Sequence, residues 1–142
     1  MKIVLACDHA GYDLKIKLMK HLHEKGHELT DLGCDSSEPV DYPEFGHAIA
    51  QHVSMKKSEF GISLCGSGNG ISMTANKHPM IRSAICWNTE IAELARGHND
   101  ANICALPARF LTLEEVVKIV EVFLATSFDG GRHKRRIEKI PI

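Results

Sequence analysis

The sequence predicts a doubly wound α/β fold, in which a parallel sheet of five strands forms the middle layer of a three-layer αβα sandwich. Two observations support this prediction. Five short apolar runs recur along the 142 residues, and each is followed by a segment with helical periodicity. The usual arrangement of five such units gives the strand order 2-1-3-4-5. The runs are Lys2–Ala6, Glu28–Leu32, Phe60–Cys65, Arg82–Cys86 and Asn102–Leu106.

The segments between these runs have the spacing of amphipathic helices. Leucines recur at every fourth position of the first segment, at Leu14, Leu18 and Leu22. The last long segment opens with Thr112 and Glu115, which have the spacing of a capping box. Each helix therefore has one apolar face that can pack on the sheet.

Length and composition indicate one globular domain over residues 1–142. Hydrophobic residues make up 44% of the chain and charged residues 25%, which is enough for a single core.

The apolar runs are much shorter than a bilayer span, so we expect no membrane association and a cytoplasmic location. The five cysteines are an odd number and lie mostly in apolar runs, so we expect free thiols. A net charge of -1 gives no overall attraction to nucleic acid.

The glycine-rich loop Cys65–Ile71 is the most informative motif. Its alternating glycines allow backbone N–H groups to converge at a helix N-terminus, where they stabilise negative charge and activate a thiol. Cys65 is then a candidate base, and the loop amides are candidate donors to an enediolate oxygen. The alternative is a buried cysteine beside a tight turn. A dinucleotide fingerprint requires glycine at the position of Ile71, and a cysteine phosphatase requires arginine there.

Asp8 and His9 follow the first apolar run. The predicted topology places them beside Cys65, because the carboxyl ends of strands 1 and 3 meet at the ligand crevice of this fold. A carboxylate can accept a sugar hydroxyl, and an imidazole can donate to a phosphate. Capping of the turn is an equally good interpretation of both residues.

His98 and Asn99 lie in a polar connection from the fourth helix to the fifth strand. Such a connection lies at the amino ends of the strands, across the sheet from the crevice. His98 can therefore act as a general acid only in the site of a neighbouring subunit, and this role predicts an oligomer. A polar turn is the alternative.

The basic tail, residues 129–142, leaves the pattern of strands and helices. Arg132 and Arg136 are spaced to share one face of a short helix, where they can bind a phosphate together with Arg109 and His9. A solvated terminus and a nucleic-acid patch are the alternatives. The nine histidines raise the question of a metal, but no His-Glu-x-x-His or Cys-x-x-Cys motif occurs, and a metal site is a minor alternative.

Taken together, these motifs resemble the ribose-5-phosphate isomerase type B family, which includes galactose-6-phosphate and allose-6-phosphate isomerases. The resemblance runs nearly end to end and implies an aldose–ketose isomerase without cofactor or metal. Its expected reaction interconverts D-ribose 5-phosphate and D-ribulose 5-phosphate through a cis-enediolate. An isomerase of a 6-phosphohexose and a non-catalytic module for a sugar phosphate or nucleotide remain alternatives. The matching segments are Cys7–Gly11, Asp41–Pro43, Cys65–Lys77, Gly97–Asn102 and Gly130–Arg136.

The resemblance also implies residue roles. Cys65 would be the base, His98 would help to open the furanose ring, and Asp8 would contact reacting hydroxyls. A subgroup of the family uses a glutamate at the position of Ile71, so in this chain the cysteine has no competitor. The loop that steadies the enediolate would comprise Gly66, Ser67, Gly68, Asn69, Gly70 and Ile71. The phosphate would be held by His9, Arg109, Arg132 and Arg136, with Asn99, Asp41 and Tyr42 completing the pocket.

The family's sites are shared between two chains. The resemblance therefore implies a homodimer, with assembly into a homotetramer left open, and a tail that packs on the partner subunit. The expected partners are a phosphorylated sugar and a second copy of the chain, without nucleic acid or membrane.

Overall fold

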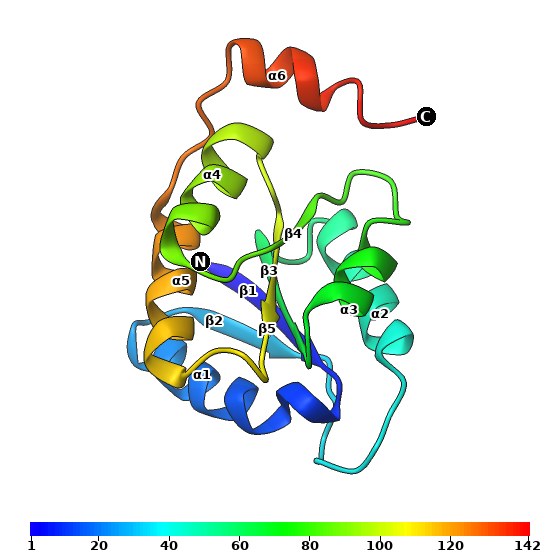
Figure 1. Ribbon diagram of the computed structural model, residues 1–142, viewed down its shortest axis with the longest axis vertical. Helices are drawn as coiled ribbons and strands as arrows, with labels where there is room; N and C mark the ends of the chain where they lie inside the picture. Colours follow the sequence, from blue (N-terminus) through cyan, green and yellow to red (C-terminus); the bar gives the residue numbers. More distant parts are fainter.

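The computed structural model describes all 142 residues and has a parallel sheet of five strands between two layers of helices (Figure 1). The predicted fold class is confirmed. The strands are β1 (Lys2–Cys7), β2 (Glu28–Asp31), β3 (Phe60–Cys65), β4 (Ser83–Ile85) and β5 (Ile103–Pro107). The helices are η1 (His9–Gly11), α1 (Tyr12–Glu24), α2 (Tyr42–Ser54), α3 (Asn69–Ala75), α4 (Thr89–Asn99), α5 (Leu113–Ala125) and α6 (Arg132–Ile137).

The strand order is β2-β1-β3-β5-β4, so the predicted order 2-1-3-4-5 is wrong for the last two strands. β5 pairs with β3, and the short strand β4 takes the edge. The reason lies in burial, because all five residues of β5 are buried, whereas the three residues of β4 are half-buried. The more apolar strand therefore occupies the inner position. This order places the loop after β5 beside the loop after β3.

The helices cover the two faces of the sheet with separate cores. The larger core joins α1, α4 and α5 to one face, and its largest helical side chain is Phe123. The smaller core joins α2 and α3 to the other face through residues such as Ile49 and Ala75. Figure 1 shows this separation, with α1, α4 and α5 on one side of the sheet and α2 and α3 on the other.

Local sequence explains where the helices begin. Thr112 and Glu115 form the predicted capping box, since the Thr112 side chain accepts from the Glu115 N–H and the Glu115 carboxylate accepts from the Thr112 N–H. Pro43 lies in the first turn of α2, where its missing N–H costs nothing. None of the helices combines the length and hydrophobicity needed to cross a lipid bilayer.

The tail forms the predicted short helix, α6, which has no buried residue. It lies against the end of α4, at the opposite end of the molecule from the turn between β1 and α1 (Figure 1). Its backbone attachment includes a hydrogen bond from the Asp129 N–H to the Gly97 carbonyl, 2.9 Å long. The protein therefore has predicted site residues at two opposite ends of the sheet.

Candidate active site

The loops that follow β1, β3 and β5 meet at the carboxyl edge of the sheet. The Asp8 N–H donates to the Leu64 carbonyl at 3.1 Å, and the Arg109 N–H donates to the Gly66 carbonyl at 3.1 Å. The three loops are thus joined by main-chain hydrogen bonds. We call the predicted site residues at this edge the carboxyl-edge cluster: Asp8, His9, Asp41, Tyr42, Cys65–Ile71 and Arg109.

Cys65 is the last residue of β3, and the residue is 4% exposed. The Gly68 N–H donates to Cys65 Sγ at 3.1 Å, which favours negative charge on the sulfur. Gly68 reaches this position with φ of 77°, a left-handed conformation that glycine adopts without strain. A Cβ there would also lie 3.3 Å from the backbone of Leu106 and Pro107. The glycine is therefore required by both backbone geometry and space.

The first turn of α3 presents unused donors beside this sulfur. The Gly70 and Ile71 amides donate to no protein acceptor, as expected for a helix N-terminus. The Ile71 side chain is fully buried, so only its amide can serve a ligand. The Tyr42 ring packs directly on Gly70, where an added Cβ would lie 2.5 Å from ring carbons. Tyr42 therefore lies beside the donors.

Ser67 and Asn69 are exposed at the tip of the loop. The Ser67 hydroxyl accepts from the Asn69 N–H at 3.3 Å, which holds the tip in a tight turn. Asp41 is exposed and precedes α2 without capping it through its side chain. Its carboxylate is therefore available to a ligand.

Asp8 can both cap the turn after β1 and accept a hydrogen bond from a ligand hydroxyl. Its Oδ1 atom accepts from the Ala10 and Gly11 N–H groups at 2.9 and 3.3 Å, so it caps η1. Its Oδ2 atom has no protein partner and can accept a hydroxyl. The side chain is 7% exposed, and its position next to β3 places it beside Cys65.

His9 is oriented by a residue that the sequence did not single out. The Val40 N–H donates to His9 Nδ1 at 3.1 Å. An Nδ1 atom that accepts must be unprotonated, so the ring proton is on Nε2. Nε2 has no protein partner, and it is therefore a donor available to an anion.

Cys7 and Cys104 are poorly suited to act as a base. Burial raises the pKa of Cys7 to about 12, although its side chain lies next to the buried cation of Lys15. A hydrogen bond with Cys86, together with burial, raises the pKa of Cys104 well above its usual range. Both thiols stay protonated at neutral pH. All five cysteines are free, as predicted.

The remaining predicted residues lie at the amino end of the sheet. We call this set the tail cluster: His98, Asn99, Arg132 and Arg136. His98 is in the last turn of α4, just before the chain enters β5, and Arg132 and Arg136 are exposed on α6. The structure therefore does not join the two clusters within one chain (Figure 1).

His98 has two close neighbours. Its ring stacks on that of His133, with centroids 4.1 Å apart and planes 10° from parallel. Its Nε2 atom lies 3.9 Å from Asp129 Oδ2. The His98 side chain is 42% exposed, and nothing in its own chain covers it completely. Asn99 is fixed through its backbone, because its carbonyl accepts from Arg82 Nε at 2.9 Å.

Comparison with known proteins identifies this arrangement. A family model described as Ribose/Galactose Isomerase matches residues 3–140. The chain belongs to the ribose/galactose isomerase family. The family resemblance predicted from the sequence is therefore confirmed.

Relatives cover nearly the whole chain. Ribose-5-phosphate isomerase B of Escherichia coli is 42% identical over 139 residues, which are 98% of this chain and 93% of the relative. The Clostridium thermocellum ribose-5-phosphate isomerase B structure has a TM-score of 0.97 at 45% identity and covers 99% of this chain and 95% of that one. The Mycoplasma genitalium enzyme, solved with bound ribulose-5-phosphate, has a TM-score of 0.94 at 40% identity, covering 98% of this chain and 93% of that one.

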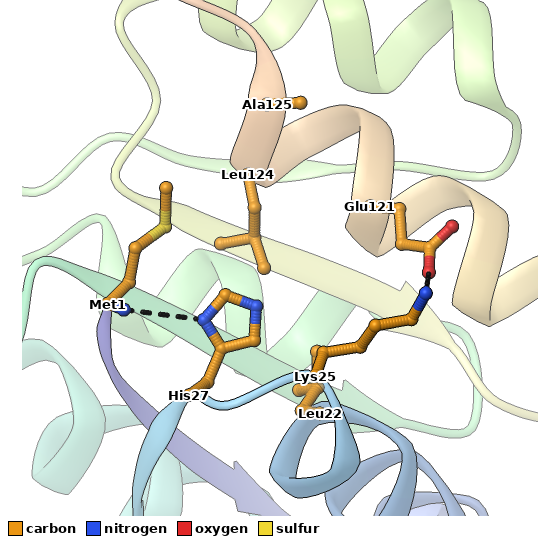
Figure 2. A pocket seen from close by; sticks show the side chains of 7 residues that line it. All are labelled: Met1, Leu22, Lys25, His27, Glu121, Leu124 and Ala125. Carbon is orange, nitrogen blue, oxygen red and sulfur yellow. Dashed lines mark hydrogen bonds and ion pairs between the residues drawn. The ribbon is translucent and has the colours of Figure 1, made fainter.

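A pocket outside both clusters lies at the amino end of β1, between α1 and α5 (Figure 2). Its volume is about 260 Å³. The Met1 amino group lies 3.4 Å from His27 Nδ1, and burial together with that ammonium lowers the pKa of His27. The pocket contains none of the family-matched site residues, and we assign it no part in the reaction. It is lined by Met1, Leu22, Lys25, His27, Glu121, Leu124 and Ala125.

Sequence reasoning did not identify three neighbours of the site: Val40, Asp129 and His133. Val40 acts through its backbone N–H, and a backbone contact cannot be predicted from the type of residue. His133 was visible only as part of the basic tail. Asp129 is an ordinary exposed acid whose proximity to His98 depends on how α6 docks on α4.

Proposed function

We propose that this member of the ribose/galactose isomerase family interconverts D-ribose 5-phosphate and D-ribulose 5-phosphate, with Cys65 as the base. The main support is that the Gly68 N–H donates to the Cys65 sulfur in the same loop that ends in the free Gly70 and Ile71 amides, while Asp8 and Cys65 follow paired residues of β1 and β3. This arrangement supplies a base and donors for an enediolate at one place.

The proposed chemistry is a proton transfer within the open-chain sugar. The Cys65 thiolate removes the C2 proton of the aldose, the C1–C2 bond becomes double, and the C1 carbonyl becomes an enediolate oxygen. The same thiol returns its proton to C1, while the O2 hydroxyl proton passes to O1 through Asp8 or Ser67. No atom or electron is gained or lost, so this chemistry requires no cofactor and no metal.

The loop amides stabilise the intermediate. Removal of one such donor in other enzymes costs about 3–4 kcal/mol of barrier stabilisation. Gly70 and Ile71 offer two donors that are already in place, so the loop need not reorganise as charge develops on the substrate oxygen. Gly66, Gly68 and Asn69 keep the loop in the required shape.

The phosphate is held from two chains in this proposal. His9 Nε2–H and the Arg109 guanidinium come from the chain that supplies Cys65, and Arg109 lies next to Gly66. Arg132 and Arg136 come from the partner, because α6 lies at the opposite end of the sheet. Forked guanidinium donors match the geometry of a phosphate.

His98 of the partner opens the furanose ring by donating a proton to the ring oxygen. The minimal functional unit is then a homodimer with two shared sites, and a homotetramer would pair two such dimers. The tail, 129–142, packs on the partner while residues 1–142 form one domain. Phe110 supports an interface near the site, since it follows Arg109 and is 75% exposed. Asn99, Asp41 and Tyr42 complete the pocket.

We also propose that the enzyme works in the cytoplasm, in pentose phosphate metabolism. All five cysteines are free thiols, which is usual where glutathione and thioredoxin keep thiols reduced. The proposal involves neither nucleic acid nor a membrane.

Turnover of ribose 5-phosphate, allose 6-phosphate and galactose 6-phosphate by the purified protein tests this function. We expect the highest kcat/KM for ribose 5-phosphate. A higher kcat/KM for either hexose phosphate would transfer the assignment to that sugar. Binding of a sugar phosphate or nucleotide without exchange of a solvent proton into any substrate would indicate a non-catalytic module.

A further inference from the structure

Two imidazoles and a carboxylate meet where α4 ends and α6 begins. The ligand atoms of His98, Asp129 and His133 all lie within 4.8 Å of one another. No second group of three histidine, cysteine or acidic side chains lies this close together in residues 1–142. Asp129 is held at this place by the hydrogen bond from its N–H to the Gly97 carbonyl, and its carboxylate lies close to Gly97, where an added Cβ would be 3.4 Å from Oδ2.

This donor set is one that Zn²⁺ prefers. Zinc takes histidine nitrogens and carboxylate oxygens at about 2.0–2.2 Å, and three protein ligands leave a fourth position for water. Imidazole ligands also favour zinc over magnesium or calcium, which prefer oxygen. The chemistry therefore matches an open zinc site.

The geometry permits closure around an ion. Ligand atoms at about 2.0 Å in a tetrahedron lie about 3.3 Å apart, so the present separations must shrink and the two stacked rings must turn. Within the single chain, all three side chains are partly or fully exposed, and α6 has no buried residue that would resist the movement. Arg132 and Arg136 add nearby positive charge, and the Asp129 carboxylate offsets part of it.

We propose that His98, Asp129 and His133 form a binding site for a divalent zinc ion. None of the residue roles described above involves a metal ion. Binding itself does not depend on the proposed isomerase activity. One consequence does rest on it: zinc at this site occupies the His98 imidazole, so it inhibits ring opening. The site would then make the enzyme sensitive to free zinc.

Titration of the metal-free protein with Co²⁺, followed by displacement with Zn²⁺, tests the site. We expect visible absorption bands of protein-bound cobalt without the near-ultraviolet band of a cobalt thiolate. His133→Ala and Asp129→Asn should each weaken binding by at least about tenfold, since even partners outside the ligand shell cost that much. Asp129 is exposed, and His133 is half-buried on a helix without a buried residue, so both variants should fold, and circular dichroism checks this.

His47→Ala provides the matched control. His47 Nδ1 and His78 Nε2 lie 2.7 Å apart, so this pair is the other place where two imidazoles meet. The control should retain cobalt affinity. Equal binding by the wild type and His133→Ala, loss of binding in His47→Ala, or a thiolate band would each overturn the proposal.

Activity provides a second measurement. Zinc should inhibit the wild type but leave His133→Ala at least about tenfold less sensitive. Equal sensitivity of the two proteins would contradict the inferred capture of His98. A wild type that binds cobalt as expected but turns over no sugar phosphate in metal-free buffer would refute the proposed function and support the metal site.

Discussion

The two clusters of site residues differ in how they are held. The carboxyl-edge cluster is built on buried loops: Cys65 is 4% exposed, Asp8 is 7% exposed, and main-chain hydrogen bonds join the loops after β1, β3 and β5. The tail cluster lies on the last turn of α4 and on α6, a helix without a buried residue. One end of the sheet is fixed by buried loops, whereas the other depends on an exposed helix.

This difference follows from what each end is proposed to do. A base and an oxyanion donor must be held within a fraction of an ångström, and a buried loop provides that precision. Residues that bind a phosphate or donate to a ring oxygen from a second chain must be exposed until that chain docks. The exposure of α6 therefore indicates that it docks on a second chain, and the burial of Cys65 indicates a precisely held base.

Cys65→Ala should have the largest effect on the carboxyl-edge cluster. Loss of the base should lower kcat by about 10³-fold or more, because positioned bases contribute about 10²–10⁴-fold. Steady-state assays of the folded variant measure this. Cys104→Ala, which removes a buried thiol far from the loop amides, serves as the control and should keep its turnover. A Cys65→Ala enzyme with near wild-type kcat would remove the thiol from the mechanism.

Arg109→Ala and Arg132→Ala compare the two ends directly. Each should lower kcat/KM by about 10–100-fold, since a hydrogen bond to a charged group is worth about 1.5–3 kcal/mol. Lys134→Ala on the same helix is the control, because Lys134 lies on a different face from Arg132 and Arg136. If Arg109→Ala is impaired while Arg132→Ala behaves like Lys134→Ala, the tail is a solvated terminus.

Alkaline pH should lower the free energy of unfolding through Cys7, the last residue of β1, which directly precedes Asp8 of the carboxyl-edge cluster. Its pKa is about 12 in the folded protein against 9.0 for a free thiol, so the unfolded chain loses its proton first. The contribution is complete below pH 9 and is lost as pH rises toward 12. At pH 10 the loss should be on the order of 1 kcal/mol.

Urea unfolding of the wild type and Cys7→Ala at pH 8 and pH 10 measures this loss. The cavity left by the substitution costs the same at both pH values, so it cancels in the difference. The variant should therefore lose less stability than the wild type between the two pH values. Equal losses would show that Cys7 is not held protonated.

The sequence predicted the parts of the site that depend on local motifs. The alternating glycines of Cys65–Ile71 predicted a loop with free amides, and the place of Asp8 after a strand predicted a capped turn at the carboxyl edge. The place of His98 between a helix and a strand predicted that it lies across the sheet from Cys65. All three follow from chain direction and residue type alone.

Other features depend on packing between distant segments. The predicted runs Arg82–Cys86 and Asn102–Leu106 are equally short, and their order in the sheet depends on which strand the core buries more deeply. The Val40 N–H reaches His9 only because the loop before α2 folds back over η1. The meeting of His98, Asp129 and His133 depends on where α6 docks.

Mixed dimers of Cys65→Ala and His98→Ala subunits test most directly the claim that two chains build one site. Neither variant alone should turn over ribose 5-phosphate at an appreciable rate. Unfolding and refolding an equal mixture should recover about a quarter of wild-type activity, because half of the dimers are hybrids and each hybrid has one complete site. A mixture that stays as inactive as its two parents would contradict a site shared between chains.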